Sequence, residues 1–225
     1  AFLVMDLESR GRTDLAWYFL NRYLQRTGDY AGMALLAYYK AYRAMVRAKI
    51  CRLRSRQPGV TAAEHDALAA QYRRYIALAD GYTVPRANTL VITHGVSGAG
   101  KTVAARAVAA RLGAVHLRSD VERKRLFGLE AAARSGSAPG EGIYTPDAGR
   151  RTYERLTELA AELLRGGATV IVDAAFLAAA DRERLRRVAA ESAVRFVILA
   201  AHAHEAELRR RIAARLAARS AALEA

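Results

Sequence analysis

A glycine-rich segment at residues 95–102 constrains this chain more than any other feature. Its sequence, GVSGAGKT, fits the pattern G-x-x-x-x-G-K-[ST] at every position, and it lies between the β-branched run 90–93 and the helical pattern 101–112. Glycines allow the backbone to turn back so that consecutive N–H groups point inward, and the positive end of the following helix adds to the same field. The segment therefore predicts a loop that binds phosphate groups.

The pattern also assigns roles to single residues of the loop. Lys101 is expected to reach the β- and γ-phosphates of ATP, and the Thr102 hydroxyl is expected to hold Mg²⁺. A dinucleotide-binding loop is excluded because its pattern, G-x-G-x-x-G, needs a third glycine where Val103 stands. The complete set of expected nucleotide contacts is Gly95, Ser97, Gly98, Ala99, Gly100, Lys101, Thr102 and Val103.

A carboxylate ends a second apolar run. Asp173 follows the residues TVIV at 169–172, which are typical of a buried strand. In parallel sheets the carboxyl ends of strands face the ligand crevice, so Asp173 is expected to hold Mg²⁺ directly or through water. The alternative is an aspartate that caps the following turn.

A third candidate group follows the apolar run 115–117. Asp120 comes directly after Ser119, and Arg123 lies one helical turn later. A phosphoryl acceptor needs a carboxylate near its hydroxyl and cations near its own charges, so Asp120 is a candidate base and Arg123 a candidate substrate contact. The alternative is that Ser119 and Asp120 cap a helix and that Arg123 is a surface residue.

Arginines recur every four residues near the C-terminal end of the sequence, at Arg211, Arg215 and Arg219. Guanidinium groups on a closing lid can stabilise the charge of a transferring phosphoryl group. A solvated helix face is the alternative.

The composition changes near Pro85. Most tyrosines and the only tryptophan lie before it, where residues 14–26 and 31–56 carry apolar residues at helical spacing and Thr61 opens a capping-box pattern. Residues 1–84 are therefore predicted to be all-helical. Aromatic residues at this spacing, Tyr18, Tyr38 and Tyr42 among them, are expected in the core rather than at a cofactor.

After Pro85 the sequence alternates between short β-branched runs and helical patterns. Besides the runs already described, residues 195–199 read as a strand, and Thr145-Pro146 reads as the start of a helix that closes at Gly166-Gly167. This alternation predicts an α/β, P-loop NTPase-type doubly wound parallel sheet over residues 85–225, preceded by the all-helical segment.

The formal net charge of +14 raises the question of a nucleic-acid partner. Only four of the 36 cationic residues are lysines, and the charge is divided evenly between the two halves of the chain. This distribution favours an arginine-rich solvated surface, so we expect no nucleic-acid partner.

The single cysteine, Cys51, cannot form an internal disulfide, and its surroundings favour a reduced, buried thiol and a cytoplasmic location. No apolar run approaches the ~20 residues of a membrane-spanning helix, so no membrane contact is expected. The sequence starts without Met inside an apolar segment, which suggests a fragment of a longer chain.

Four segments in order, VITHGVSGAGKT, AVHLRSDVERKRL, GATVIVDAAF and VRFVILAAHAHEAELRRRIAAR, resemble the P-loop small-molecule kinases related to zeta toxins and gluconate kinases. The resemblance covers residues 88–219. It implies phosphoryl transfer from ATP, with Mg²⁺, to a hydroxyl of a small molecule, with Asp120 as the acceptor-side aspartate and with Arg211 and Arg215 as catalytic lid arginines. The stretch after these arginines departs from the family and leaves the adenine pocket unassigned.

The first segment, AFLVMDLESRGRTDLAWYFLNRYLQRTGDY with AYRAMVRAKI, resembles the C-terminal helical end of an aminoglycoside-phosphotransferase-like domain. The resemblance implies that such a domain lies upstream in the full-length chain. Because that family's catalytic and metal-binding aspartates precede the matching segment, this half is expected to be catalytically silent alone.

Two other functions fit the sequence. The ATP site could belong to a regulatory module that controls the attached phosphotransferase without chemistry of its own. A nucleic-acid 5′-end kinase is favoured by the charge, but the loop region lacks interleaved basic and aromatic residues.

Overall fold

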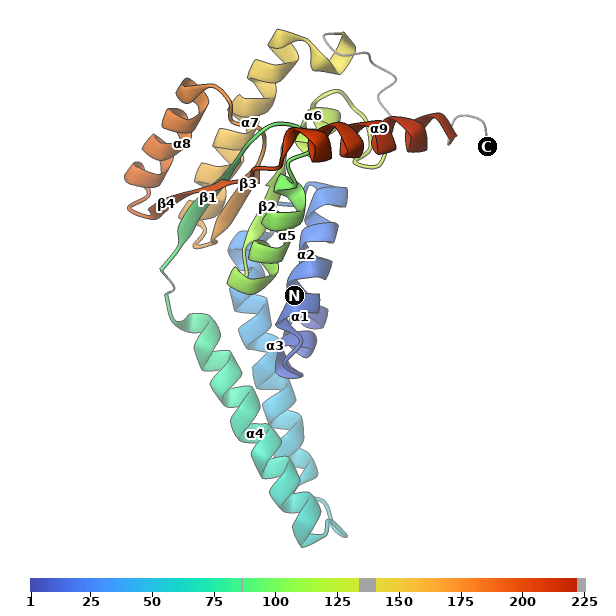
Figure 1. Ribbon diagram of the computed structural model, residues 1–225. Helices are drawn as coiled ribbons and strands as arrows, with labels where there is room; N and C mark the ends of the chain where they lie inside the picture. The colour runs from blue at the N-terminus through green and yellow to red at the C-terminus, as the bar shows by residue number, and fades with distance from the viewer. Residues whose placement is uncertain (86, 134–140, 222–225) are drawn as a thin grey trace. The chain divides into compact units, whose positions relative to one another are not determined.

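The computed structural model describes the backbone of residues 1–85, 87–133 and 141–221, with the side chains of residue 212 and residues 215–221 outside the described set. The chain divides into two compact units, Ala1–Ala87 and Asn88–Ala225. Figure 1 shows the helices of the first unit in blue to teal and the sheet of the second in green to red. None of the described helices is long and apolar enough to cross a membrane.

The described part of the first unit is helical, as predicted. Gly28, in the left-handed conformation with φ 74°, ends the second of its helices. The predicted capping box is confirmed, because the Thr61 side chain accepts from the Glu64 N–H and the Glu64 carboxylate accepts from the Thr61 N–H at 3.0 Å. The helices are α1 (Phe2–Ser9), α2 (Thr13–Thr27), α3 (Met33–Arg54) and α4 (Ala62–Thr83).

The core of this unit is built mainly from small residues between α3 and α4. Its buried cluster comprises Met5, Ala44, Ala48, Cys51, Tyr75 and Ala79, and alanines allow the two helices to pack closely. The expectation that Tyr18, Tyr38 and Tyr42 lie in the core is wrong, since their exposed fractions are 50%, 65% and 55%. On α3, Tyr42 stands two positions before Ala44, about 200° around the helix, so burying the alanine seam turns Tyr42 outward.

The second unit is built on a four-stranded sheet with strand order β2-β3-β1-β4 in its described part. All three strand pairings are parallel, which confirms the predicted parallel α/β fold. The strands are β1 (Thr89–His94), β2 (Val115–Arg118), β3 (Val170–Asp173) and β4 (Arg195–Ala200). Each lies within two residues of its sequence-predicted position.

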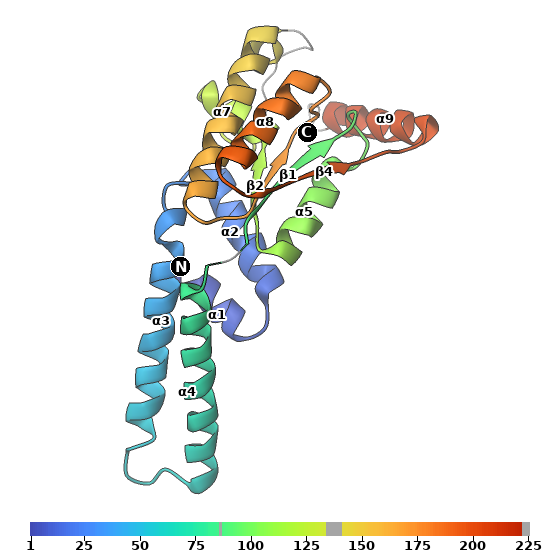
Figure 2. The same cartoon turned by 90° about the vertical axis from the view of Figure 1, so that its left-hand side faces the viewer.

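Helices cover both faces of the sheet (Figure 2). Helix α5 (Lys101–Leu112) packs on one face, and α7 (Pro146–Arg165) and α8 (Ala179–Glu191) pack on the other. Helix α6 (Ser119–Leu126) follows β2, a short 3-10 turn η1 (Gly142–Tyr144) precedes α7, and α9 (Glu205–Ala221) follows β4. The residues of β1 and β3 are nearly all fully buried, so the sheet forms the centre of this unit.

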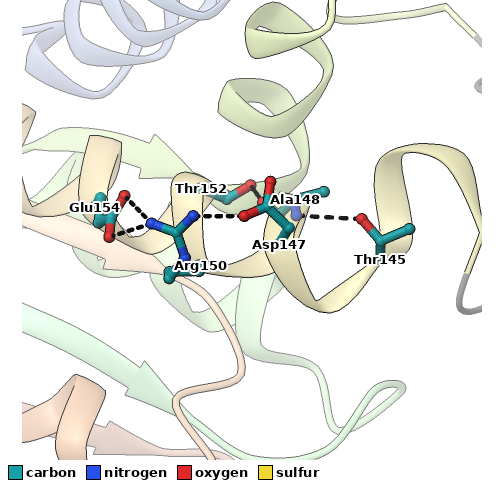
Figure 3. A network of polar contacts seen from close by, with 6 residues as sticks. All are labelled: Thr145, Asp147, Ala148, Arg150, Thr152 and Glu154. Atoms are coloured by element: carbon teal, nitrogen blue, oxygen red, sulfur yellow. Dashed lines mark hydrogen bonds and ion pairs between the residues drawn. The ribbon is translucent and has the colours of Figure 1, made fainter.

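Helix α7 begins where the sequence predicted. The Thr145 hydroxyl accepts from the Ala148 N–H at 3.3 Å, and Pro146 occupies the first helical position (Figure 3). On the exposed side, Arg150 bridges Asp147 and Glu154. On the buried side, the Thr152 hydroxyl donates to the Ala148 carbonyl at 2.7 Å, which fixes a side chain that faces α6.

Candidate functional site

The phosphate loop, residues 95–102, connects β1 to α5 at the carboxyl end of the sheet. Gly95 has φ 137° and donates its N–H to the Ala175 carbonyl at 3.2 Å. A Cβ on Gly95 would lie 2.4 Å from the Ala201 carbonyl oxygen, so no larger residue fits without a shift of the backbone. Gly95 therefore lies close to the residues that follow β3 and β4, and these contacts fix the start of the loop.

Two cations contact carbonyl oxygens of this loop. Lys101 Nζ donates to the Val96 carbonyl at 2.8 Å, and Arg211 Nη1, from α9, donates to the Gly98 carbonyl at 3.1 Å. The structure thus brings Arg211 to the loop across more than a hundred residues of sequence. Arg215 lies in the same helix, but its side chain is outside the described set.

Arg211 is itself held by a carboxylate of its own helix. Glu207 Oε1 accepts from Arg211 Nε at 2.5 Å, and Glu207 Oε2 accepts from Arg210 Nε at 2.8 Å. The hydrogen bonds from Arg210 and Arg211 lower the pKa of Glu207 to about 2. The carboxylate is therefore charged over the whole physiological range and orients both guanidinium groups.

Asp173, at the end of β3, is the buried carboxylate of the site, with 5% of its surface exposed. Its Oδ2 lies 3.2 Å from His116 Nε2, and its Oδ1 lies 3.4 Å from the Thr93 hydroxyl. Burial raises the pKa of Asp173, but hydrogen bonds from His116 and Thr102 and the nearby charges outweigh it, so the pKa lies below its ordinary value. Asp173 is thus an anion at neutral pH. Its hydrogen-bond contacts reach across the sheet to His116 on β2 and to Thr93 on β1.

The donor atoms at this point fit Mg²⁺. The Thr102 hydroxyl and the Asp173 carboxylate are hard oxygen ligands that line the same cavity. No group of three or more His, Cys, Asp or Glu side chains suited to a metal occurs among the described residues. A small donor set of this kind suits Mg²⁺, which keeps water and phosphate oxygens in its coordination shell.

The acceptor-side candidates lie on α6. Asp120 is in its first turn, has a side chain 46% exposed and pairs with Lys124 Nζ at 3.0 Å. The helix-capping alternative is not supported, because the N-cap residue is Arg118 and no side-chain capping bond is present. Arg123 is partly buried, donates from Nε to the Thr152 hydroxyl at 3.4 Å and lies 5.2 Å from the Tyr144 ring centroid.

A cavity of about 460 Å³ joins these groups. Of the sequence-predicted residues whose side chains are described, Gly95, Ala99 and Arg211 are not among those that line it. Five lining residues were not predicted as site residues: Arg118, Ser119, Tyr153, Ala174 and Ala175. The predicted residues in the lining are Ser97, Gly98, Gly100, Lys101, Thr102, Val103, Asp120, Arg123 and Asp173.

Sequence reasoning missed Tyr153 and His116. The Tyr153 hydroxyl accepts from the Phe176 N–H at 3.3 Å and its ring meets the Phe176 ring edge-on, so it supports the loop after β3. Burial raises the pKa of Tyr153. Nothing in the helical pattern of α7 distinguishes Tyr153, whereas His116 carried a signal as the single polar residue between apolar neighbours in a strand pattern.

The match to a protein-family model agrees with this architecture. Residues 90–225 match the protein family described as "AAA domain". The chain is 35% identical over 192 residues to "Uncharacterized protein Rv2004c" of Mycobacterium tuberculosis (strain ATCC 25618 / H37Rv) and to "Uncharacterized protein Mb2027c" of Mycobacterium bovis. The alignment covers 85% of this chain and 37% of each relative, so the chain spans little more than a third of the relatives' length.

A solved structure also resembles part of this chain. It is described as a "putative kinase" from Chloroflexus aurantiacus and shares 21% sequence identity. The superposition has a TM-score of 0.49 and covers 60% of this chain and 69% of that chain.

Proposed function

The chain belongs to the AAA domain family through residues 90–225, and we propose that this part binds ATP with Mg²⁺ and transfers the terminal phosphoryl group to a hydroxyl of a small molecule. The observation that carries the proposal is the single cavity that the phosphate loop shares with Asp120 and Arg123. A kinase requires such a shared space because the two substrates must meet in line.

Two cations lie against the phosphate loop, where nucleotide phosphates would bind. Lys101 and Arg211 now donate to loop carbonyls at Val96 and Gly98, and both would exchange these neutral acceptors for charged phosphate oxygens. Thr102 and Asp173 would hold Mg²⁺, which supplies positive charge at the β- and γ-phosphate oxygens. Arg215 is proposed as a second lid arginine of the same helix.

On the side of the cavity where the acceptor would bind, a candidate base, Asp120, and a cation, Arg123, line the wall. Asp120 would accept the proton of the attacking hydroxyl, and its pairing with Lys124 keeps the carboxylate at the cavity wall. Arg123 would contact the acceptor, because the Thr152 hydroxyl and the Tyr144 ring hold its guanidinium group in place. These roles agree with those that the resemblance to small-molecule kinases related to zeta toxins and gluconate kinases implies.

The test is incubation of the purified chain with ATP, Mg²⁺ and a metabolite mixture, followed by mass spectrometry. We expect a product heavier by one phosphoryl group that is absent with Lys101→Ala, which removes the phosphate-binding cation. Arg106→Ala, an exposed change on the same helix, is the matched control. ATP binding without consumption in any mixture would count against the kinase.

The second candidate is a nucleotide-binding module that regulates a larger protein. Two observations favour it: Lys124 already neutralises Asp120, and the curated relatives are far longer than this chain. In this case ATP would bind with the same dependence on Lys101 and Mg²⁺, Asp120→Asn would leave ATP affinity unchanged, and no acceptor would be phosphorylated by either protein.

We further propose that an aminoglycoside-phosphotransferase-like domain precedes the helical unit in the full-length chain. The resemblance of the first helices to the end of such a domain supports this proposal, and so does the greater length of the relatives. The structure of a full-length relative would decide it, since any other fold upstream of the matching helices contradicts it.

A further inference from the structure

A histidine lies buried in the middle of β2. His116 is 3% exposed, and its neighbours Val115 and Leu117 are fully buried apolar residues. An imidazole in such surroundings needs hydrogen-bond partners, because an unsatisfied buried polar group destabilises the fold. Its Nε2 lies 3.2 Å from Oδ2 of Asp173, which is itself 5% exposed.

The sheet register brings the two side chains together. His116 pairs with Ile171 on β3, and Asp173 follows Ile171 by two residues on the same face. Ile171 belongs to the cluster that packs against Ala105 and Ala109, so this is the face covered by α5. The first turn of α5 carries Thr102, which lines the same cavity as Asp173.

The other contact of the carboxylate is weaker. The Thr93 hydroxyl lies 3.4 Å from Asp173 Oδ1 but only 2.7 Å from the Ala174 carbonyl oxygen. A hydroxyl has one proton, and the shorter distance commits it to the Ala174 carbonyl. The N–H of His116, on a ring fixed by burial, is therefore the stronger of the two constraints on how the carboxylate turns.

We propose that His116 is a positioning residue of the metal site, which holds the Asp173 carboxylate toward the cavity that Asp173 lines together with Thr102. The inference rests on the proposed function, in which Thr102 and Asp173 hold Mg²⁺. His116 is not among the residues that line the cavity, so it acts through Asp173 rather than on a substrate. Loss of such a supporting partner typically lowers metal affinity about 10–100-fold.

The experiment compares two replacements of His116. In His116→Gln the side-chain amide nitrogen takes the place of Nε2 and keeps an N–H donor, whereas His116→Leu fills similar space without a donor. Calorimetry measures ATP affinity with excess Mg²⁺ and again with EDTA, and thermal unfolding checks the fold. We expect His116→Leu to lose about 10–100-fold in affinity with Mg²⁺ and nothing in EDTA, and His116→Gln to stay close to wild type.

Three results would overturn the inference. Equal losses with Mg²⁺ and in EDTA would show a general structural role, and unchanged affinity in both would show no role. A wild-type protein whose ATP affinity does not depend on Mg²⁺ would contradict the proposed metal site as well, so the two failures are distinguishable. If His116→Leu does not fold, His116→Asn replaces it, because the Asn amide is one carbon too short to reach the Nε2 position.

Discussion

Arg211 of α9 donates from Nη1 to the carbonyl oxygen of Gly98 at 3.1 Å, so the C-terminal helix of the described chain touches the phosphate loop. The same guanidinium lies 3.6 Å from the place where a Cβ on Gly100 would stand. A neutral carbonyl is a weaker partner for a guanidinium than a phosphate oxygen. The contact therefore places Arg211 where nucleotide phosphates would compete for it.

Arg211→Ala is expected to slow phosphoryl transfer by about 10³-fold or more, the range known for arginines that stabilise the transferring group. ATP affinity should fall much less, because Lys101 and the loop N–H groups remain. Steady-state kinetics and calorimetry measure the two effects. Arg210→Ala is the matched control, since Arg210 shares Glu207 as a partner but has no described contact with the loop. Equal rates for both variants would remove Arg211 from the mechanism.

The titration of Glu207 reports on the same arrangement. Hydrogen bonds from Arg210 and Arg211 lower the pKa of Glu207 to about 2, from an ordinary value of 4.5. A lowered folded-state pKa means that the stabilising contribution is complete above pH 4.5 and is lost as the pH falls toward 2. Carboxyl NMR should show a midpoint well below 4.5, and Arg211→Ala should move it upward. An ordinary midpoint in the wild-type protein would show that Glu207 does not pair with Arg210 and Arg211 in solution.

Gly95→Ala should destabilise the second unit. The added Cβ would meet the Ala201 carbonyl at 2.4 Å, and the φ of 137° strains any side chain. Such backbone strain costs on the order of 1–3 kcal/mol before the contact with Ala201 is added. Gly149→Ala is the control: nothing lies within 4 Å of its added Cβ, and alanine in a helix is about 1 kcal/mol more favourable than glycine. Thermal unfolding should therefore shift in opposite directions, and a neutral Gly95→Ala would contradict the described loop.

The local signals of the sequence were sufficient for the second unit's elements. Helix α5 spans Lys101–Leu112, as predicted, because glycines on both sides end the helical pattern. Strands β1, β2 and β3 follow from short apolar runs that suit a buried parallel sheet, whereas β4, at the edge of the described sheet, keeps residues that are exposed or half-buried. The loop residues of the candidate site could be proposed from the sequence for the same reason, since the pattern lies within eight consecutive residues.

The remaining features depend on contacts between distant residues. His116 and Asp173 are 57 residues apart and meet only because β2 pairs with β3. Tyr42 was expected in the core because periodicity shows that a helix has an apolar face without showing which face is buried. On α3 the face that carries the alanines is the buried one, since alanine allows the closest approach of α4. Local sequence patterns therefore predict neither the order of the strands in the sheet nor which face of a helix is buried.

Asp120→Asn separates a kinase from a regulatory module. If Asp120 accepts the proton of the acceptor hydroxyl, the change should lower turnover about 10²–10⁴-fold and leave ATP affinity unchanged, because Asp120 contacts Lys124 rather than the phosphate loop. A surface ion pair of this type contributes at most about 1 kcal/mol, so lost stability cannot produce such an effect. Asp173→Asn is the comparison, since it should weaken Mg²⁺-dependent ATP binding as well as turnover. A folded Asp120→Asn protein that phosphorylates its acceptor at the wild-type rate would exclude Asp120 as the base.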